Sequence, residues 1–123
     1  MFELEKDLYS CLAEIYNTTE LNDRVYADEL DLNYDFKENK VGIYYTINNI
    51  NDNEYKDKVT IDVNFYSRVE NKIKMLKVID VFDEKLNGKD FKNYWITHKN
   101  VWLITLKEDE LFHYVLSYTV NKY

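Results

Sequence analysis

The stretch VTIDVNFYSRVENKIKMLKVIDVFDEKLNG, residues 59 to 88, contains two different hydrophobic periodicities in succession. In its first part every second residue is apolar, and these residues are Val59, Ile61, Val63 and Phe65. The residues between them, Thr60, Asp62 and Asn64, are polar. Side chains of a strand point alternately to its two faces, so this part predicts a strand over 59–66 with one buried face.

The second part of the stretch has the spacing of a helix. After a polar turn at Ser67 and Arg68, apolar residues recur at steps of three and four, and they are Ile73, Leu76, Ile79, Phe82 and Leu86. Such steps place the side chains on one stripe of a helix. Gly88 follows the stripe, at the position where a left-handed residue commonly ends a helix. We expect Ile61, Phe65, Leu76 and Phe82 to lie in the core.

Residues before this stretch predict another helix and the partner of the strand. The segment Phe2–Tyr16 carries an apolar stripe of Leu4, Leu8, Leu12 and Ile15, which predicts an amphipathic helix ending at Asn17-Thr18-Thr19. Val25 and Tyr26 begin a short strand, and the acidic segment Asp28–Glu38 reads as an edge strand or an exposed loop. Val41, Ile43, Tyr45 and Ile47 alternate with other residues, so we expect a hairpin between this strand and Val59–Tyr66.

The rest of the chain predicts more strands. Tyr94–His98 is a possible strand, Val101–Leu106 is a second one, and Lys107–Glu110 turns the chain back into an alternating strand over Leu111–Val120. Phe112, Tyr114, Leu116, Tyr118 and Val120 share one face of this last strand, opposite His113, Ser117 and Thr119. The predicted fold is α+β: an antiparallel sheet with two helices packed on one face, as a single domain over residues 1–123.

Composition limits the classes of function. The 123 residues include 16 basic and 23 acidic ones, for a formal charge of −7, so a sequence-independent grip on phosphate backbones is not expected. Cys11 is the one cysteine, which excludes an intramolecular disulfide. We find no signal-peptide pattern and no apolar run approaching the ~20 residues of a membrane helix, so we expect a protein made in the cytosol that does not enter a membrane.

The sequence contains no pattern that predicts catalysis, and we expect no enzyme and no cofactor. A glycine-rich phosphate loop, a cysteine pair and a His-Glu-x-x-His motif are all missing. His98 and His113 lack metal-ligand spacing, so structural roles are favoured, and Cys11 suits a small buried side chain. The acidic segment Asn51–Asp57 has the composition but not the spacing of a calcium loop. Asp62 fits the solvated face of the sheet better than an acid/base pair with Glu70 or Asp80.

The segment Lys58–Phe91 resembles the tail terminator and tail-completion proteins of long-tailed phages and phage-tail-like bacteriocins. Its sequence is KVTIDVNFYSRVENKIKMLKVIDVFDEKLNGKDF. In those small α+β proteins a strand of alternating apolar residues ends in a short polar turn, and the following helix ends in Leu-x-Gly or a close variant. The matching positions here are Val59–Tyr66, Ser67–Asn71 and Leu86–Gly88. The first helix and the C-terminal hairpin fit the same architecture. The acidic segment Asp28–Glu38 and the polar hairpin tip Asn48–Lys58 depart from it.

The resemblance implies a structural protein of the particle. Copies of the chain would form a hexameric ring that caps the last ring of tail tube subunits, stops polymerisation, and presents a surface to sheath, head-connector or collar proteins. The particle would be assembled in a bacterial cytoplasm, and DNA would pass through the lumen without sticking to an acidic surface. Such a ring needs two different complementary patches on each subunit.

The polar hairpin tip and the aromatic C-terminal third are the expected patches, since Trp and Tyr dominate interface hot spots. The candidate interface residues are Asn51, Asp52, Asn53, Glu54, Tyr55, Asp57, Trp95 and Trp102. Two other classes of function stay open. One is a small ligand-binding or hydrolytic domain with a pocket lined by Tyr and Trp, and the other is an acidic regulatory interaction protein of a mobile element.

Overall fold

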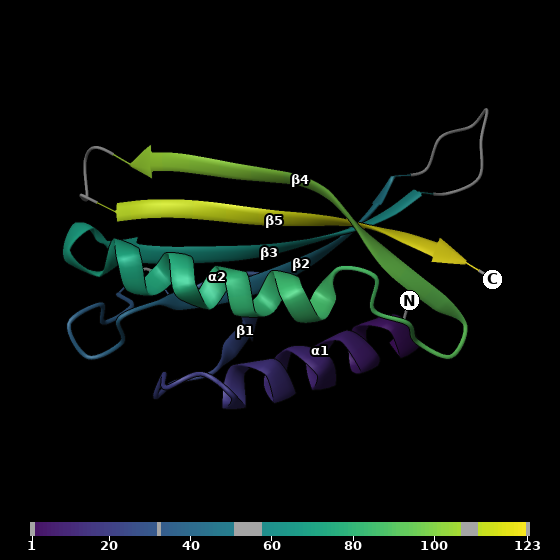
Figure 1. Cartoon of the computed structure of the whole chain (residues 1–123), viewed down its shortest axis with the longest axis horizontal. Helices are drawn as coiled ribbons and strands as arrows, with labels where there is room; N and C mark the ends of the chain where they lie inside the picture. The colour runs from purple at the N-terminus through teal and green to yellow at the C-terminus, as the bar shows by residue number, and fades with distance from the viewer. Residues whose placement is uncertain (1, 32, 51–57, 107–110, 123) are drawn as a thin grey trace.

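A computed structural model describes residues 2–31, 33–50, 58–106 and 111–122. The elements follow one another along the chain as α1 (Phe2–Asn17), β1 (Val25–Ala27), β2 (Gly42–Ile50), β3 (Lys58–Arg68), a 3₁₀ turn η1 (Val69–Asn71), α2 (Lys72–Leu86), β4 (Tyr94–Leu106) and β5 (Leu111–Lys122). Figure 1 shows the strands as one twisted sheet with the two helices lying along it. The α+β class is therefore confirmed.

The sheet has five strands in the order β1-β2-β3-β5-β4. The predicted hairpin of β2 and β3 is present, with Ile43 paired to Phe65, and β5 inserts between β3 and β4 with Tyr114 opposite Phe65. The four long strands pair with one another in antiparallel directions, as predicted. The short strand predicted at Val25 exists, but it pairs parallel to β2, with Val25 opposite Ile43, so the sheet is mixed.

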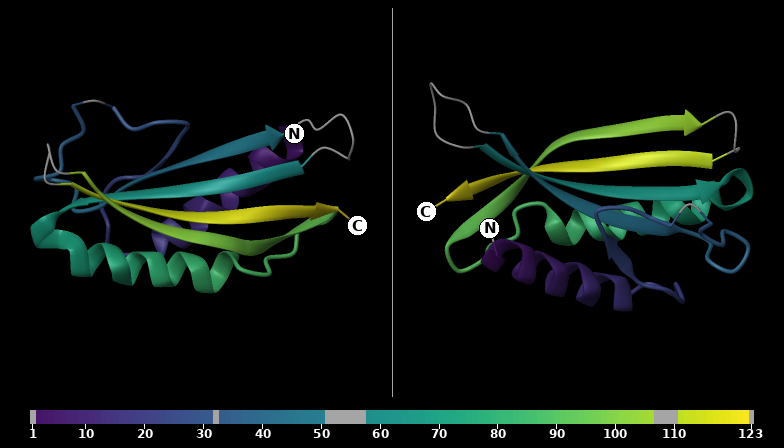
Figure 2. Two further views of the ribbon diagram at one scale, coloured as in Figure 1. Left: turned by 90° about the horizontal axis from the view of Figure 1, so that it is seen from above. Right: turned by 180° about the vertical axis from the view of Figure 1, so that it is seen from behind.

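Both helices pack on the same face of the sheet, where they enclose the core (Figures 1 and 2). The α1 stripe Leu4, Leu8, Leu12 and Ile15 is buried as predicted, and so is Cys11. Two threonines end this helix, because the hydroxyls of Thr18 and Thr19 donate to the carbonyls of Ile15 and Tyr16. The rings of Phe65 on β3 and Phe82 on α2 pack edge to face, with their centres 5.4 Å apart. This contact holds α2 against the middle of the sheet.

The buried stripe of α2 differs from the predicted one in its first turn. The buried residues are Met75, Val78, Ile79, Phe82 and Leu86, whereas Leu76 is only partly buried. Ile73 is 67% exposed, so its assignment to the stripe was wrong. Met75 lies two residues after Ile73, which is about 200° around a helix, so the two side chains point to opposite sides of α2. The helix follows η1 in the rotation that turns Met75 toward the sheet.

The boundaries of α2 also differ from the prediction at one end. Ser67, expected in a turn, continues β3 as a fully buried residue, and the chain turns only in η1. At the other end Gly88 has φ +78, the left-handed conformation expected of it. Its N–H donates to the carbonyl of Ile96, which fastens the end of the helix to β4.

The two predicted strands at Tyr94–His98 and Val101–Leu106 form one strand, β4, with a bulge between His98 and Asn100. The connection from α2 runs along the outer edge of its first half. There Phe91 N–H donates to the Tyr94 carbonyl, and Ile96 N–H donates to the Lys89 carbonyl. The side chain of Asn87 accepts from His98 N–H at 2.9 Å. Part of the sheet edge is therefore covered by the chain's own backbone.

Of the two readings of the acidic segment, the loop is correct. Residues 28–41 form turns beside β2, apart from Leu32, which lies outside the described residues. Leu30 and Tyr34 lie over Gly42, where an added Cβ would come within 2.7 Å of Leu30 Cδ1 and 3.0 Å of Tyr34 Cε1. The absence of a side chain at Gly42 lets this loop approach the sheet. The middle of the predicted hairpin tip, residues 51–57, and the turn at 107–110 lie outside the described residues.

Candidate interaction surfaces

The face of the sheet opposite the helices carries a row of polar side chains on three neighbouring strands. On β3, Asp62 Oδ1 accepts from the hydroxyl of Ser117 on β5 at 2.6 Å, and its Oδ2 accepts from Asn48 Nδ2 on β2 at 3.0 Å. Asp62 pairs in register with Ser117 and with Thr46, so these contacts link both of its neighbours to the central strand. The expected position of Asp62 on the non-core face is confirmed.

Next to this network, three rings stack across the same face. The rings of Tyr66 and His113 lie 4.1 Å apart and nearly parallel, at 9°, and Tyr44 stacks on the other side of Tyr66 at 6.0 Å. The imidazole Nε2 of His113 lies 2.8 Å from Asn64 Oδ1, and Asn64 is itself buried. Burial lowers the pKa of His113, and burial together with the Tyr44 hydroxyl raises the pKa of Tyr66. We therefore expect Tyr66 and His113 to be uncharged at neutral pH.

On the helix side, buried tyrosines of the sheet reach carboxylates on the helices. Tyr118 donates to Asp83 of α2 at 2.7 Å, and Tyr94 donates to Asp7 of α1 at 2.9 Å. Tyr45 makes a longer contact of 3.4 Å with Glu5, and burial, then the Glu5 charge, raises its pKa to about 12. Each tyrosine ring packs in the core, while its hydroxyl contacts a carboxylate at the edge of a helix. These pairs account for part of the high tyrosine content.

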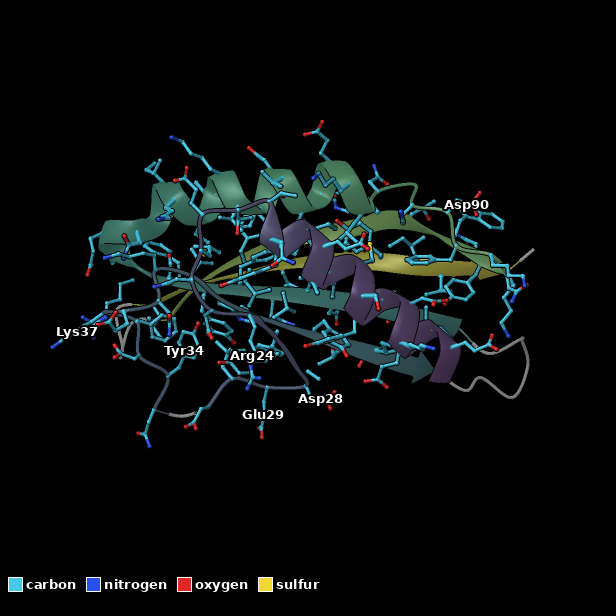
Figure 3. The ribbon with its side chains drawn as sticks, turned by 90° about the horizontal axis from the view of Figure 1, so that it is seen from below. Arg24, Asp28, Glu29, Tyr34, Lys37 and Asp90 are labelled. Carbon is cyan, nitrogen blue, oxygen red and sulfur yellow. The ribbon has the colours of Figure 1, made fainter. Side chains whose placement is uncertain are left out.

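The acidic loop is anchored through one carboxylate, that of Asp23. Asp23 Oδ2 accepts from Tyr34 at 2.7 Å, both carboxylate oxygens lie 3.0 Å from the Tyr26 hydroxyl, and the Asp23 N–H donates to the hydroxyl of Tyr16. Burial, followed by the contact with Asp23, raises the pKa of Tyr34. Figure 3 shows Tyr34 and Lys37 in this loop, on the side of the sheet away from α2. The loop therefore presents a defined surface.

The carboxylates of this loop face solvent. They are the exposed side chains of Asp28, Glu29, Asp31, Asp35 and Glu38. Asp31 and Asp35 also accept from backbone N–H groups within the loop, at Asn33 and Lys37. Asp28 has φ 70, a left-handed conformation that Asp adopts more readily than most residues. Local hydrogen bonds thus hold a dense negative charge in place.

Within the described residues, the side chains needed for catalysis or metal binding are not brought together. The search of those residues finds no group of three His, Cys, Asp or Glu able to hold a metal ion. Asp62 bonds to Ser117 and Asn48 on the open face of the sheet, whereas Asp80 is an exposed residue of α2 on the other face. Burial raises the pKa of Cys11, which keeps it a thiol.

The two histidines have different surroundings. His113 belongs to the ring stack, whereas His98 Nδ1 lies 3.8 Å from Asp83 Oδ1 on the other face of the sheet. Asp83 thus meets both His98 and the Tyr118 hydroxyl. The Nε2 atom of His98 has no hydrogen-bond partner among the described residues. Both histidines have local contacts of the kind expected for structural residues.

The structure describes few of the predicted interface residues. Asn51, Asp52, Asn53, Glu54, Tyr55 and Asp57 lie outside the described residues, so their assignment stays a prediction. Trp95 is half-buried on β4, and its carbonyl oxygen lies 3.4 Å from Asn121 Nδ2. The backbone of Trp102 pairs with Val115, while its side chain is outside the described part.

Sequence reasoning did not select the Asn64–His113 contact or the Asp23 cluster. The alternating pattern had placed Asn64 and His113 on the polar faces of their strands. This was the one sequence signal from which their contact could have been inferred. Comparisons with family models, curated proteins and solved structures found no match. None of the helices in the described residues combines the length and apolar character needed to cross a membrane.

Proposed function

We propose that this chain is a structural subunit of a phage tail or phage-tail-like particle, where it forms a ring that caps the tail tube. The observation that carries the proposal is the Lys58–Phe91 stretch, whose strand, turn, helix and terminal Leu-Asn-Gly resemble those of tail terminators. The order of elements around it supports the same assignment, because a helix precedes the β2–β3 hairpin and the β4–β5 hairpin follows α2.

The use of the polar side chains also favours a scaffold. Asp62 bonds to Ser117 and Asn64 bonds to His113, both between β3 and β5, and core tyrosines bond to helix carboxylates. These contacts join elements that are distant in sequence, and satisfied polar networks of this kind rigidify a fold. A rigid subunit suits a ring that must hold its shape on the end of a tube.

The proposed partners are further copies of the chain, the tail tube protein, and sheath, connector or collar proteins on the opposite side of the ring. DNA would only pass through the lumen. With a formal charge of −7, a ring of such subunits carries a large negative charge, which disfavours adhesion of phosphate backbones. The particle would be completed inside the bacterial cell in which the chain is made.

The proposal is tested by mixing the purified chain with the tail tube protein of the same particle during tube polymerisation. We expect a ring by native mass spectrometry and tubes whose mean length falls as the chain is added, with density at one tube end in electron micrographs. A chain that stays monomeric and leaves tube length unchanged would contradict the proposal. Binding of a small molecule by that monomer, or a 1:1 complex with another protein, would support the alternative classes.

A further inference from the structure

The start of α2 exposes apolar side chains that the fold does not cover. In the described residues the exposed large hydrophobic side chains are Tyr9 at 43%, Val69 at 55% and Ile73 at 67%. Val69 lies in η1 and Ile73 in the first turn of α2, so both exposed side chains are at the same end of the helix. We take these two exposed branched apolar side chains as a candidate contact surface.

Basic side chains surround this apolar pair. Residues 68–77 contain four basic residues, Arg68, Lys72, Lys74 and Lys77, and one acidic residue, Glu70, for a net charge of +3 in a chain of −7. Lys72 Nζ lies 4.5 Å from the centre of the Phe112 ring. No carboxylate of a described residue lies within 4.0 Å of Lys74 or Lys77 in an ion pair. We call the exposed and half-exposed side chains of residues 68–77 the basic surface.

A surface of opposite charge lies on the other side of the same molecule. Residues 28–38 contain five acidic residues and one basic residue, Lys37, for a net charge of −4. We call this loop the acidic surface. Figures 2 and 3 show the sheet between it and α2, with Asp28, Glu29 and Lys37 on the side away from that helix. One molecule therefore cannot bring its own two surfaces together.

We propose that the basic surface of one copy binds the acidic surface of the next copy, and that this contact builds the ring. The proposal rests on the proposed function and names the contact that function requires. Two different patches on opposite sides give a head-to-tail contact, which closes into a ring when the rotation between copies is suitable. Charges of +3 and −4 attract, and the contact buries Val69 and Ile73.

Two charge-reversal variants test the contact. Lys74→Glu with Lys77→Glu changes the net charge of the basic surface from +3 to −1, and Glu29→Lys with Asn33→Lys and Glu38→Lys changes that of the acidic surface from −4 to +1. The side chains of these five residues make no hydrogen bond or ion pair to described residues, so the fold should tolerate the changes. We expect each variant alone to show at least about tenfold less ring at low salt, because like charges then oppose each other.

Mixing the two variants in equal amounts gives the sharpest result. The basic surface that was made acidic in one variant attracts the acidic surface that was made basic in the other. The unchanged acidic surface of the first variant also attracts the unchanged basic surface of the second, so rings of alternating subunits should form. One chain that carries all five substitutions should also form rings. Lys6→Glu with Lys92→Glu matches the first variant in net charge at exposed sites outside both surfaces, and it should leave the ring unchanged. Native mass spectrometry and light scattering measure each ring fraction.

Tube capping by the same samples separates the two proposals. Wild-type rings that cap tubes, together with reversed variants that still assemble alone, would overturn the proposed contact and leave the function standing. A wild-type chain that neither assembles nor caps would overturn both. If Lys74→Glu with Lys77→Glu abolishes binding to duplex DNA at low salt and leaves the ring intact, the basic surface binds a polyanion and our inference is wrong.

Discussion

The hydroxyl of Tyr118 on β5 donates to Oδ1 of Asp83 on α2 at 2.7 Å, and the tyrosine ring is fully buried. This contact joins two elements whose residues are 35 positions apart. Because a hydrogen bond to a charged group stabilises more than a neutral one, it is a main polar link between the sheet and α2.

Replacing Tyr118 by Phe should therefore lower the free energy of unfolding by about 1.5–3 kcal/mol, since the ring stays and the bond to a charged acceptor is lost. Urea denaturation measures the change. Tyr114→Phe on the same strand is the control, because Tyr114 is only partly buried and makes no hydrogen bond to a described residue. Equal losses in the two variants would show that the Asp83 contact adds nothing to stability.

The His113 stack predicts a loss of stability in acid. Burial holds the pKa of His113 below 6.5 in the folded chain, so the unfolded chain takes up its proton first as the pH falls. The contribution of neutral His113 to the free energy of unfolding is fully present above 6.5, the pKa of the unfolded chain. It declines as the pH falls from 6.5 toward the lower pKa of the folded chain. Unfolding curves of the wild type and His113→Gln should diverge in this window. A pH-independent difference between them would contradict the buried, neutral state.

Two isoleucines of α2 offer a matched test of the helix phase. Ile79 is 4% exposed and Ile73 is 67% exposed, so the same substitution should have different costs. Ile79→Ala should destabilise the folded subunit by about 2–5 kcal/mol through lost burial and a cavity. Ile73→Ala should change the free energy of unfolding by no more than about 0.5 kcal/mol when it is measured on the monomeric chain. A large loss at Ile73 in the monomer would mean that α2 is rotated relative to the structure.

Gly42→Ala should displace the acidic loop. The new Cβ would lie 2.7 Å from Leu30 Cδ1, closer than side chains tolerate, so we expect a loss of about 1–3 kcal/mol and faster tryptic cleavage at Lys37 or Lys40. Gly88→Ala is the control. It meets no atom within 4 Å but has φ +78, so it should cost about 1 kcal/mol without exposing the loop. Unchanged cleavage in Gly42→Ala would show that the loop does not rest on β2.

Most of the fold was predictable because its elements carry strong local periodicities. The β3 alternation, the α1 stripe and the left-handed Gly88 are each properties of a few adjacent residues, and they gave the element types and the α+β class. The sequence determined the rotation of α2 about its axis less well, because Ile79, Phe82 and Leu86 fit two overlapping apolar stripes, one with Ile73 and one with Met75. Only packing against the sheet decides between Ile73 and Met75.

The surfaces were harder to predict, because they depend on pairing between distant segments. Asp62 and Ser117 are 55 residues apart, and their contact depends on the β3–β5 register, which neither strand encodes alone. The parallel direction of β1 is likewise set by its docking on β2, since three residues give no directional signal. The Asp23 cluster gathers tyrosines from α1, β1 and the acidic loop, so no local pattern marks it.

The connection that runs beside the first half of β4 also has a consequence for strand addition from outside. The backbone groups of Tyr94, Ile96 and His98 on the outer edge are already bonded to residues 87–91, and the bulge after His98 interrupts the register. An incoming strand could pair only with the residues beyond the bulge. Shortening the available edge in this way is a recognised protection against edge-to-edge pairing with a strand of another molecule, which is a common route to aggregation.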